Sequence, residues 1–140
     1  MPSWLRRLFG RKETGQWAIS VGEKDGRTVV IRKRTRPPTG LNPDDYPHSV
    51  EVLWRFDGSA TAGMPPPEVH GLLVACEDMF LRLEGPATGI LGLSITGNGQ
   101  REWVWYVADA AVFTRKIGEL LSKARQPFPL EVRVVATGSA

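Results

Sequence analysis

Segments with two different hydrophobic periods follow one another from His48 onward, and their order limits the folds open to this chain. Apolar and polar side chains alternate in four segments, as is typical of half-buried strands: residues 48–56, 89–96, 101–107 and 128–135. Apolar side chains recur every three or four positions between Pro65 and Gly85 and again between Asp109 and Pro127, which predicts two helices. The predicted order is therefore strand, helix, strand, strand, helix, strand.

With right-handed crossovers, this order predicts an α+β fold, the ferredoxin-like two-layer sandwich (βαββαβ) with both helices on one face of the sheet. Residues 17–21 and 27–32 flank a turn-like segment and predict an added N-terminal β-hairpin, which could extend the sheet edge or cover its open face. Pro-rich residues 33–47 are interpreted as an exposed connector. We expect a single domain over residues 15–137, preceded by a basic amphipathic segment at residues 1–14.

The size and composition of the chain are those of an ordinary globular domain. It has 140 residues, of which 41% are hydrophobic. A domain of about 150 residues buries roughly 68–70% of its unfolded surface, which is enough for a core. The single cysteine, Cys76, cannot form an internal disulfide. These features exclude a disulfide-rich secreted scaffold, a collagen-like repeat and a chain too polar to fold.

Positive charge is concentrated at the start of the sequence. The formal net charge is +3, but residues 1–40 contain 10 basic and 3 acidic side chains (+7), whereas residues 41–140 contain 8 and 12 (−4). One hypothesis is therefore an anionic partner, RNA or a membrane surface, bound by eight cations: Arg6, Arg7, Arg11, Lys12, Arg32, Lys33, Arg34 and Arg36. Residues 1–12 could form an amphipathic helix that binds a membrane reversibly, or could pack against the protein itself. Without a secretory signal or a spanning segment, the expected location is cytoplasmic.

An Asn-Gly pair between two apolar runs predicts a tight β-hairpin whose register decides where two tryptophans lie. A two-residue turn pairs Gly97 with Gln100 and places Trp103 and Trp105 on the face away from the helices. A three-residue turn pairs Thr96 with Gln100 and places both tryptophans in the core. The tryptophans are accordingly either a surface for a partner or part of the packing.

Several short motifs resemble one bacterial protein family. They are the run 96–106 followed by Asp109, and, before it, Tyr46-Pro47, Val50, Gly63-Met64-Pro65 and Glu77-Asp78. Over roughly residues 15–135, they resemble bacterial domain-of-unknown-function family 695, which is similar in organisation to the regulator of ribonuclease E activity B (RraB). The resemblance implies a ferredoxin-like domain whose relatives include a protein that acts by binding another protein.

Residues able to perform catalysis or to bind a metal are few. Cys76 lies at a helical core position, where thiols are usually buried and inert. His48 and His70 lack the spacing of a metal site and are interpreted as surface residues. Glu77 and Asp78 are adjacent on a predicted helix and are interpreted as part of its solvated face. We therefore expect no enzymatic activity, no metal site and no cofactor.

The predicted function is a non-enzymatic protein-binding or regulatory module. Its candidate contact residues surround the predicted hairpin: Thr96, Arg101, Glu102, Trp103, Trp105 and Tyr106. RNA-recognition motifs share the strand order, but residues 101–106 lack their glycine and aromatic pattern, and Glu102 would repel phosphate. A protein is therefore the expected partner, and the sequence does not indicate an oligomeric state.

Overall fold

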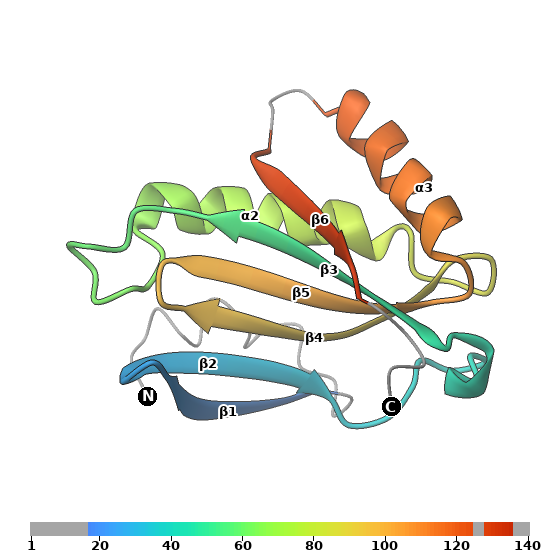
Figure 1. Cartoon of the computed structure of the whole chain (residues 1–140), viewed down its shortest axis with the longest axis horizontal. Coiled ribbons are helices and arrows are strands. Elements are labelled where there is room, and N and C mark those ends of the chain that lie inside the picture. The colour runs from blue at the N-terminus through green and yellow to red at the C-terminus, as the bar shows by residue number, and fades with distance from the viewer. Residues whose placement is uncertain (1–16, 125–127, 136–140) are drawn as a thin grey trace.

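A computed structural model of the chain describes residues 17–124 and 128–135, which form an open, six-stranded antiparallel sheet and two α-helices (Figure 1). The strands are β1 (Trp17–Lys24), β2 (Arg27–Arg34), β3 (His48–Arg55), β4 (Gly89–Gly97), β5 (Gln100–Val107) and β6 (Leu130–Val134). The helices are α2 (Pro67–Leu81) and α3 (Ala110–Ser122), and a short 3-10 helix, η2, spans Pro43–Asp45. The predicted α+β class is confirmed.

The strands lie in the order β1-β2-β4-β5-β3-β6, and every neighbouring pair is antiparallel. Because β2 pairs with β4, the N-terminal hairpin extends the sheet at its edge and does not fold over its open face. β2 also continues two residues beyond the predicted strand, to Arg34, which lies opposite Trp17 of β1. Arg32 and Arg34 therefore belong to a strand, and the interpretation of residues 33 and 34 as exposed connector is wrong.

Local sequence signals set the helix boundaries. α2 has Pro67 in its first turn, where the missing proline N–H leaves no hydrogen bond unmade. Asp109 caps α3 as predicted, since its Oδ1 accepts a hydrogen bond from the Val112 N–H at 3.0 Å. No helix within the described residues is long and apolar enough to cross a membrane.

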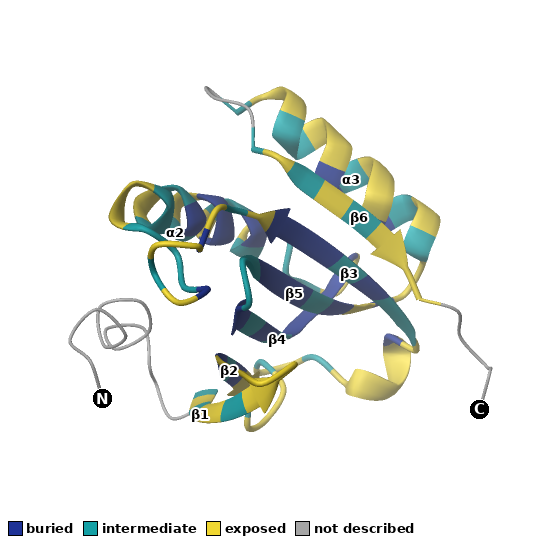
Figure 2. Cartoon of the chain, turned by 60° about the vertical axis from the view of Figure 1, so that its left-hand side comes forward, coloured by how far each residue is buried: buried dark blue, intermediate teal, exposed yellow. Residues whose placement is uncertain are grey.

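The core lies between the two helices and one face of the sheet, named here the helix-covered face (Figure 2). Trp103 and Trp105 are at its centre and are fully buried. Phe80 of α2 meets the Trp103 ring edge-on with 5.1 Å between centroids, and Phe113 of α3 packs against Trp105 at 5.0 Å. Aromatic pairs of this kind contribute about 0.5–1.5 kcal/mol beyond the area they bury. Each tryptophan thus fixes one helix to the sheet.

The turn between β4 and β5 has the shorter of the two predicted loops. Asn98 and Gly99 have φ values of +54° and +77°, and Gly97 pairs with Gln100. Positive φ at both central residues is what a two-residue primed turn requires, and Asn followed by Gly adopts it readily. Of the two alternatives that the sequence leaves open, the two-residue turn is therefore the one that forms.

The face predicted for the tryptophans is nevertheless wrong, because the helices cover the side of β5 that carries Trp103 and Trp105. The pairing of Ser94 with Trp103 follows the two-residue turn, but the register shifts between Leu91 and Leu93. Leu91 then lies opposite Trp105, and both side chains join the core. Trp103 and Trp105 therefore belong to the packing and form no exposed surface.

Candidate functional site

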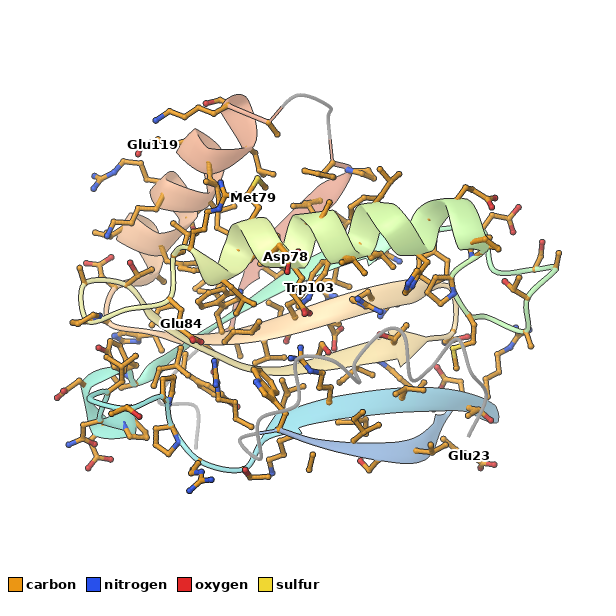
Figure 3. The ribbon with its side chains drawn as sticks, turned by 180° about the vertical axis from the view of Figure 1, so that it is seen from behind. Glu23, Asp78, Met79, Glu84, Trp103 and Glu119 are labelled. Atoms are coloured by element: carbon orange, nitrogen blue, oxygen red, sulfur yellow. The ribbon has the colours of Figure 1, made fainter. Side chains whose placement is uncertain are left out.

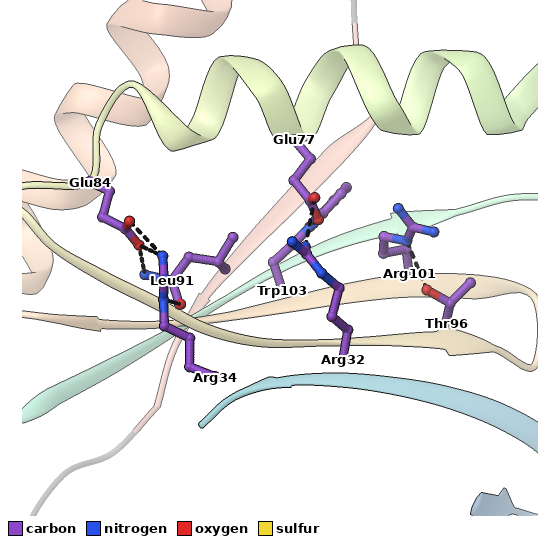
Figure 4. A network of polar contacts seen from close by, with 8 residues as sticks. All are labelled: Arg32, Arg34, Glu77, Glu84, Leu91, Thr96, Arg101 and Trp103. Atoms are coloured by element: carbon purple, nitrogen blue, oxygen red, sulfur yellow. Dashed lines mark hydrogen bonds and ion pairs between the residues drawn. The ribbon is translucent and has the colours of Figure 1, made fainter. Parts of the chain in front are cut away.

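A buried carboxylate, Glu77, connects polar side chains beneath α2 (Figure 4). Its Oε1 accepts a hydrogen bond from Trp103 Nε1, and its Oε2 accepts one from Arg32 Nη1, both at 2.9 Å. The interpretation of Glu77 as part of a solvated helix face is wrong, since only 8% of the residue is exposed. Glu77 follows Leu73 by four positions and precedes Phe80 by three, so it lies on the buried stripe of the helix.

Arg101 of β5 is a second guanidinium inside the protein, with 1% of the residue exposed. Its Nε donates a hydrogen bond to Thr96 Oγ1 at 2.8 Å, and its guanidinium carbon lies 5.9 Å from the centroid of the Trp103 ring. Burial lowers the pKa of Arg101 to about 10, although attraction to Glu77 opposes this effect, so the group is cationic at neutral pH. Arg101 and Thr96 thus lie in the interior, where a partner does not reach their side chains.

Arg34 joins the end of β2 to the segment after α2 (Figure 4). Its Nη2 lies 2.6 Å from both carboxylate oxygens of Glu84, and its Nε donates to the Leu91 carbonyl at 3.1 Å. The guanidinium carbons of Arg32 and Arg34 lie 4.0 and 4.3 Å from the centroid of the Trp17 ring, within cation–π range. Both arginines are held by internal carboxylates and an aromatic ring. Because these contacts engage both guanidinium groups inside the protein, they disfavour a role of Arg32 and Arg34 at an external anionic surface, and that role stays a prediction.

The six predicted contact residues of the hairpin are divided between the interior and the surface. Four are buried almost completely: Thr96, Arg101, Trp103 and Trp105. Figure 3 shows Trp103 between α2 and the sheet. Glu102 is 9% exposed and lies 4.0 Å from Arg133. Tyr106, with 38% exposed, is the member of this set whose side chain a partner can reach.

Tyr106 lines a pocket of about 350 Å³ on the opposite side of the sheet, named here the helix-free face. The walls are largely apolar and include Pro37, Pro43, Tyr46, Ile90 and Leu93. Three cations also line this Tyr106 pocket: Lys33, Arg34 and Arg36. Lys33 and Arg36 are exposed, whereas Arg34 is paired with Glu84. Among the described residues that line the pocket, none carries a carboxylate.

The bulged strand and the connector together form the Tyr106 pocket. A Cβ atom at Gly92 would lie 2.3 Å from Tyr106 Cε2, so the absence of a side chain allows the tyrosine ring to lie across β4. Tyr46 is 4% exposed, and its hydroxyl donates a hydrogen bond to the Pro86 carbonyl at 3.1 Å. This bond holds the connector beside the sheet. The pocket therefore depends on a glycine at the bulge and on an anchored loop.

The Tyr106 pocket brings together residues from two separate predictions. Tyr106 was expected to contact a protein partner, while Lys33 and Arg36 were expected to contact an anion. The other predicted cations lie outside the described residues: Arg6, Arg7, Arg11 and Lys12. Tyr46 and Gly92 also line the pocket and are not among the predicted site residues. Glycine within the β4 strand was the available signal, because it often marks a bulge or a close approach.

Cys76 is buried in the core and is not one of the residues that line the Tyr106 pocket. Burial, together with repulsion from Glu77, raises the pKa of Cys76 to about 12, so the thiol is protonated at neutral pH. Within residues 17–124 and 128–135, no group of three or more His, Cys, Asp or Glu side chains could hold a metal ion. The chain matches no protein-family model, and no curated protein matches its sequence.

Proposed function

We propose that this protein is a non-enzymatic binding module that contacts a protein partner through the Tyr106 pocket. The observation that carries this proposal is the grouping of an exposed tyrosine, a largely apolar pocket and two exposed cations on a face that neither α2 nor α3 covers. Aromatic and arginine side chains are enriched at protein interfaces, where a few such residues supply most of the binding energy. A regulatory role through binding is consistent with this chemistry.

We further propose that the segment from β3 to β6 has the ferredoxin-like arrangement. Its element order is strand, helix, strand, strand, helix, strand, and its strands lie as β4-β5-β3-β6 in the sheet. The resemblance to domain-of-unknown-function family 695 and to RraB stays a prediction. It adds the expectation that relatives act by binding proteins.

RNA or a membrane surface is the alternative partner, and carboxylates on the part of the helix-free face that does not line the Tyr106 pocket disfavour a polyanion long enough to cross the whole face. Glu51, Glu102 and Glu131 lie on this face of β3, β5 and β6. Arg133 lies 3.9 Å from Glu51 and 4.0 Å from Glu102, and Arg55 Nε lies 2.9 Å from Glu131. The arginines of this region are therefore already paired with carboxylates. A phosphate chain crossing the face would meet fixed negative charge.

Photocrosslinking in the cells that produce the protein tests the proposed function. One variant carries p-benzoylphenylalanine in place of Tyr106, and the matched control carries it in place of Arg115 of α3, whose side chain is 66% exposed. We expect discrete adducts from position 106 alone that protease removes and ribonuclease leaves intact. Adducts removed by ribonuclease, the same adducts from both positions, or no adduct from position 106 would contradict the proposal.

A further inference from the structure

The form of the Tyr106 pocket favours one large side chain that projects from a longer chain. The pocket has a volume of about 350 Å³ and is open to solvent on one side. Free small ligands typically have about 70–90% of their surface buried in their sites, which an open pocket does not provide. A side chain carried by a peptide needs enclosure only of its outer part, because the peptide backbone makes further contacts on the surrounding face.

The walls of the pocket favour an aromatic ring in that side chain. Tyr106 presents part of its ring to solvent, and Pro37 and Leu93 supply apolar surface nearby. Aromatic rings gain energy by packing in tilted or offset arrangements with about 4.5–7 Å between centroids. A proline-rich ligand would instead require a groove lined by several exposed aromatic residues, and Tyr46 is only 4% exposed.

The charges at the border favour acidic residues beside that ring. Lys33 and Arg36 are exposed, and no ion pair with a described residue involves either of them. Arg34 is already neutralised by Glu84. We infer that the Tyr106 pocket binds an aromatic side chain flanked by acidic residues in a segment of the protein partner, an inference that rests on the proposed function.

Fluorescence anisotropy with the purified full-length protein tests this inference. The probe is a fluorescein-labelled peptide with one tryptophan between two acidic tracts. Two comparison peptides replace the tryptophan by alanine or the acidic residues by lysine, and a third comparison probe is a labelled single-stranded RNA. We expect the acidic tryptophan peptide to bind at least about tenfold more tightly than each comparison probe, which corresponds to about 1.4 kcal/mol.

Two double charge reversals, one at the border of the Tyr106 pocket and one far from it, provide a matched pair of variants. Lys33→Glu combined with Arg36→Glu should weaken binding of the acidic tryptophan peptide by about tenfold, because attraction becomes repulsion. Lys24→Glu combined with Arg27→Glu makes the same charge change in exposed residues at the other end of the β1–β2 hairpin, and should change binding less than about twofold. Tyr106→Ala should also weaken binding by about tenfold. Urea unfolding of each variant verifies that it is folded.

Three results would overturn the inference: equal binding of the tryptophan and alanine peptides, equal effects of the two double reversals, or no saturable binding at about 1 mM peptide. After any of these results, protein adducts from position 106 would still support the proposed function and would indicate a partner of different chemistry. Tighter binding of RNA than of the acidic tryptophan peptide would overturn both proposals.

Discussion

Glu77 accepts two hydrogen bonds in a place where a carboxylate is costly to bury. Arg32 supplies the opposite charge and Trp103 supplies a second donor, each at 2.9 Å. Burial of an ion pair is tolerated when the geometry is good and further hydrogen bonds satisfy the charged groups. The three residues come from α2, β2 and β5. One carboxylate therefore links the N-terminal hairpin to the core.

Glu77→Ala is expected to lower the free energy of unfolding by about 3–5 kcal/mol, because it leaves the Arg32 guanidinium buried without this carboxylate. Glu119→Ala is the matched control, since Glu119 is an exposed carboxylate on α3 (Figure 3) and its loss should change stability by less than about 0.5 kcal/mol. Urea unfolding followed by tryptophan fluorescence measures both values. Equal losses in the two variants would contradict the role of Glu77.

Cys76 makes a pH-dependent contribution to stability. Burial raises the pKa of Cys76 to about 12 in the folded protein, whereas an exposed thiol titrates near pH 8.5. Above about pH 8.5 the unfolded chain loses a proton that the folded chain keeps, so this contribution falls as pH rises, by up to about 1.4 kcal/mol per unit. We expect the stability difference between wild type and Cys76→Ala to decrease from about pH 8 to pH 10. A stability difference that stays constant over this pH range would contradict a raised pKa of Cys76 in the folded protein.

The turn between β4 and β5 uses a backbone conformation that glycine adopts at little cost. Gly99 has φ of +77°, so Gly99→Ala should lower the free energy of unfolding by about 1 kcal/mol. Gly118→Ala provides the opposite case, since Gly118 lies in α3 with open space around its Cβ position. That substitution should raise stability by roughly 0.5–1 kcal/mol. Thermal or urea unfolding measures both changes, and the same sign for the two would contradict this account.

The β-bulge in β4 has consequences on both faces of the sheet. On the helix-covered face it places Leu91 opposite Trp105 in the core. On the helix-free face it places Gly92 beneath the Tyr106 ring. Bulges redirect side chains and are frequent beside functional sites. In this protein the extra residue is Gly92. Its insertion turns Leu91 toward the core and leaves room for the Tyr106 ring at the pocket.

Across the described part of the molecule, two of the ten basic residues of positions 1–40 are neutralised internally. Arg32 and Arg34 of β2 pair with Glu77 of α2 and with Glu84 in the segment after it. The charge difference between the two parts of the sequence thus helps to hold the hairpin against the rest of the fold. Within the described part of the predicted cation cluster, Lys33 and Arg36 are the exposed members.

Amide hydrogen exchange is expected to be slowest in β3 and β5 and faster in β1 and β6. β3 and β5 have a paired strand on each side, whereas β1 and β6 are the two edges of the sheet. Edge strands with mostly exposed side chains open locally at a lower free energy than the centre of the core. Mass spectrometry of deuterated peptides measures the exchange rate of each strand. Exchange in β1 as slow as in β5 would contradict it.

Local patterns sufficed to predict the α+β class, both helices, the strands after His48 and a tight turn at Asn98-Gly99, although they left two lengths open for that turn. Alternation, helical spacing, the Asp109 cap and the Asn-Gly turn are properties of residues that are near one another in the chain. The free energies that favour these local structures depend little on the rest of the molecule. For the candidate site, the same patterns identified Tyr106, Lys33 and Arg36 separately, without indicating that they line one pocket.

Contacts between distant segments determine the placement of the N-terminal hairpin, the bulge at Gly92 and the burial of charged residues. Arg32 and Glu77 are 45 positions apart, and each would be expected at the surface if considered without the other. A charge is stable in the interior only where folding brings an opposite charge and further donors beside it. The Tyr106 pocket has the same origin, because its walls come from β2, the connector, β4 and β5, and those segments become neighbours only in the folded sheet.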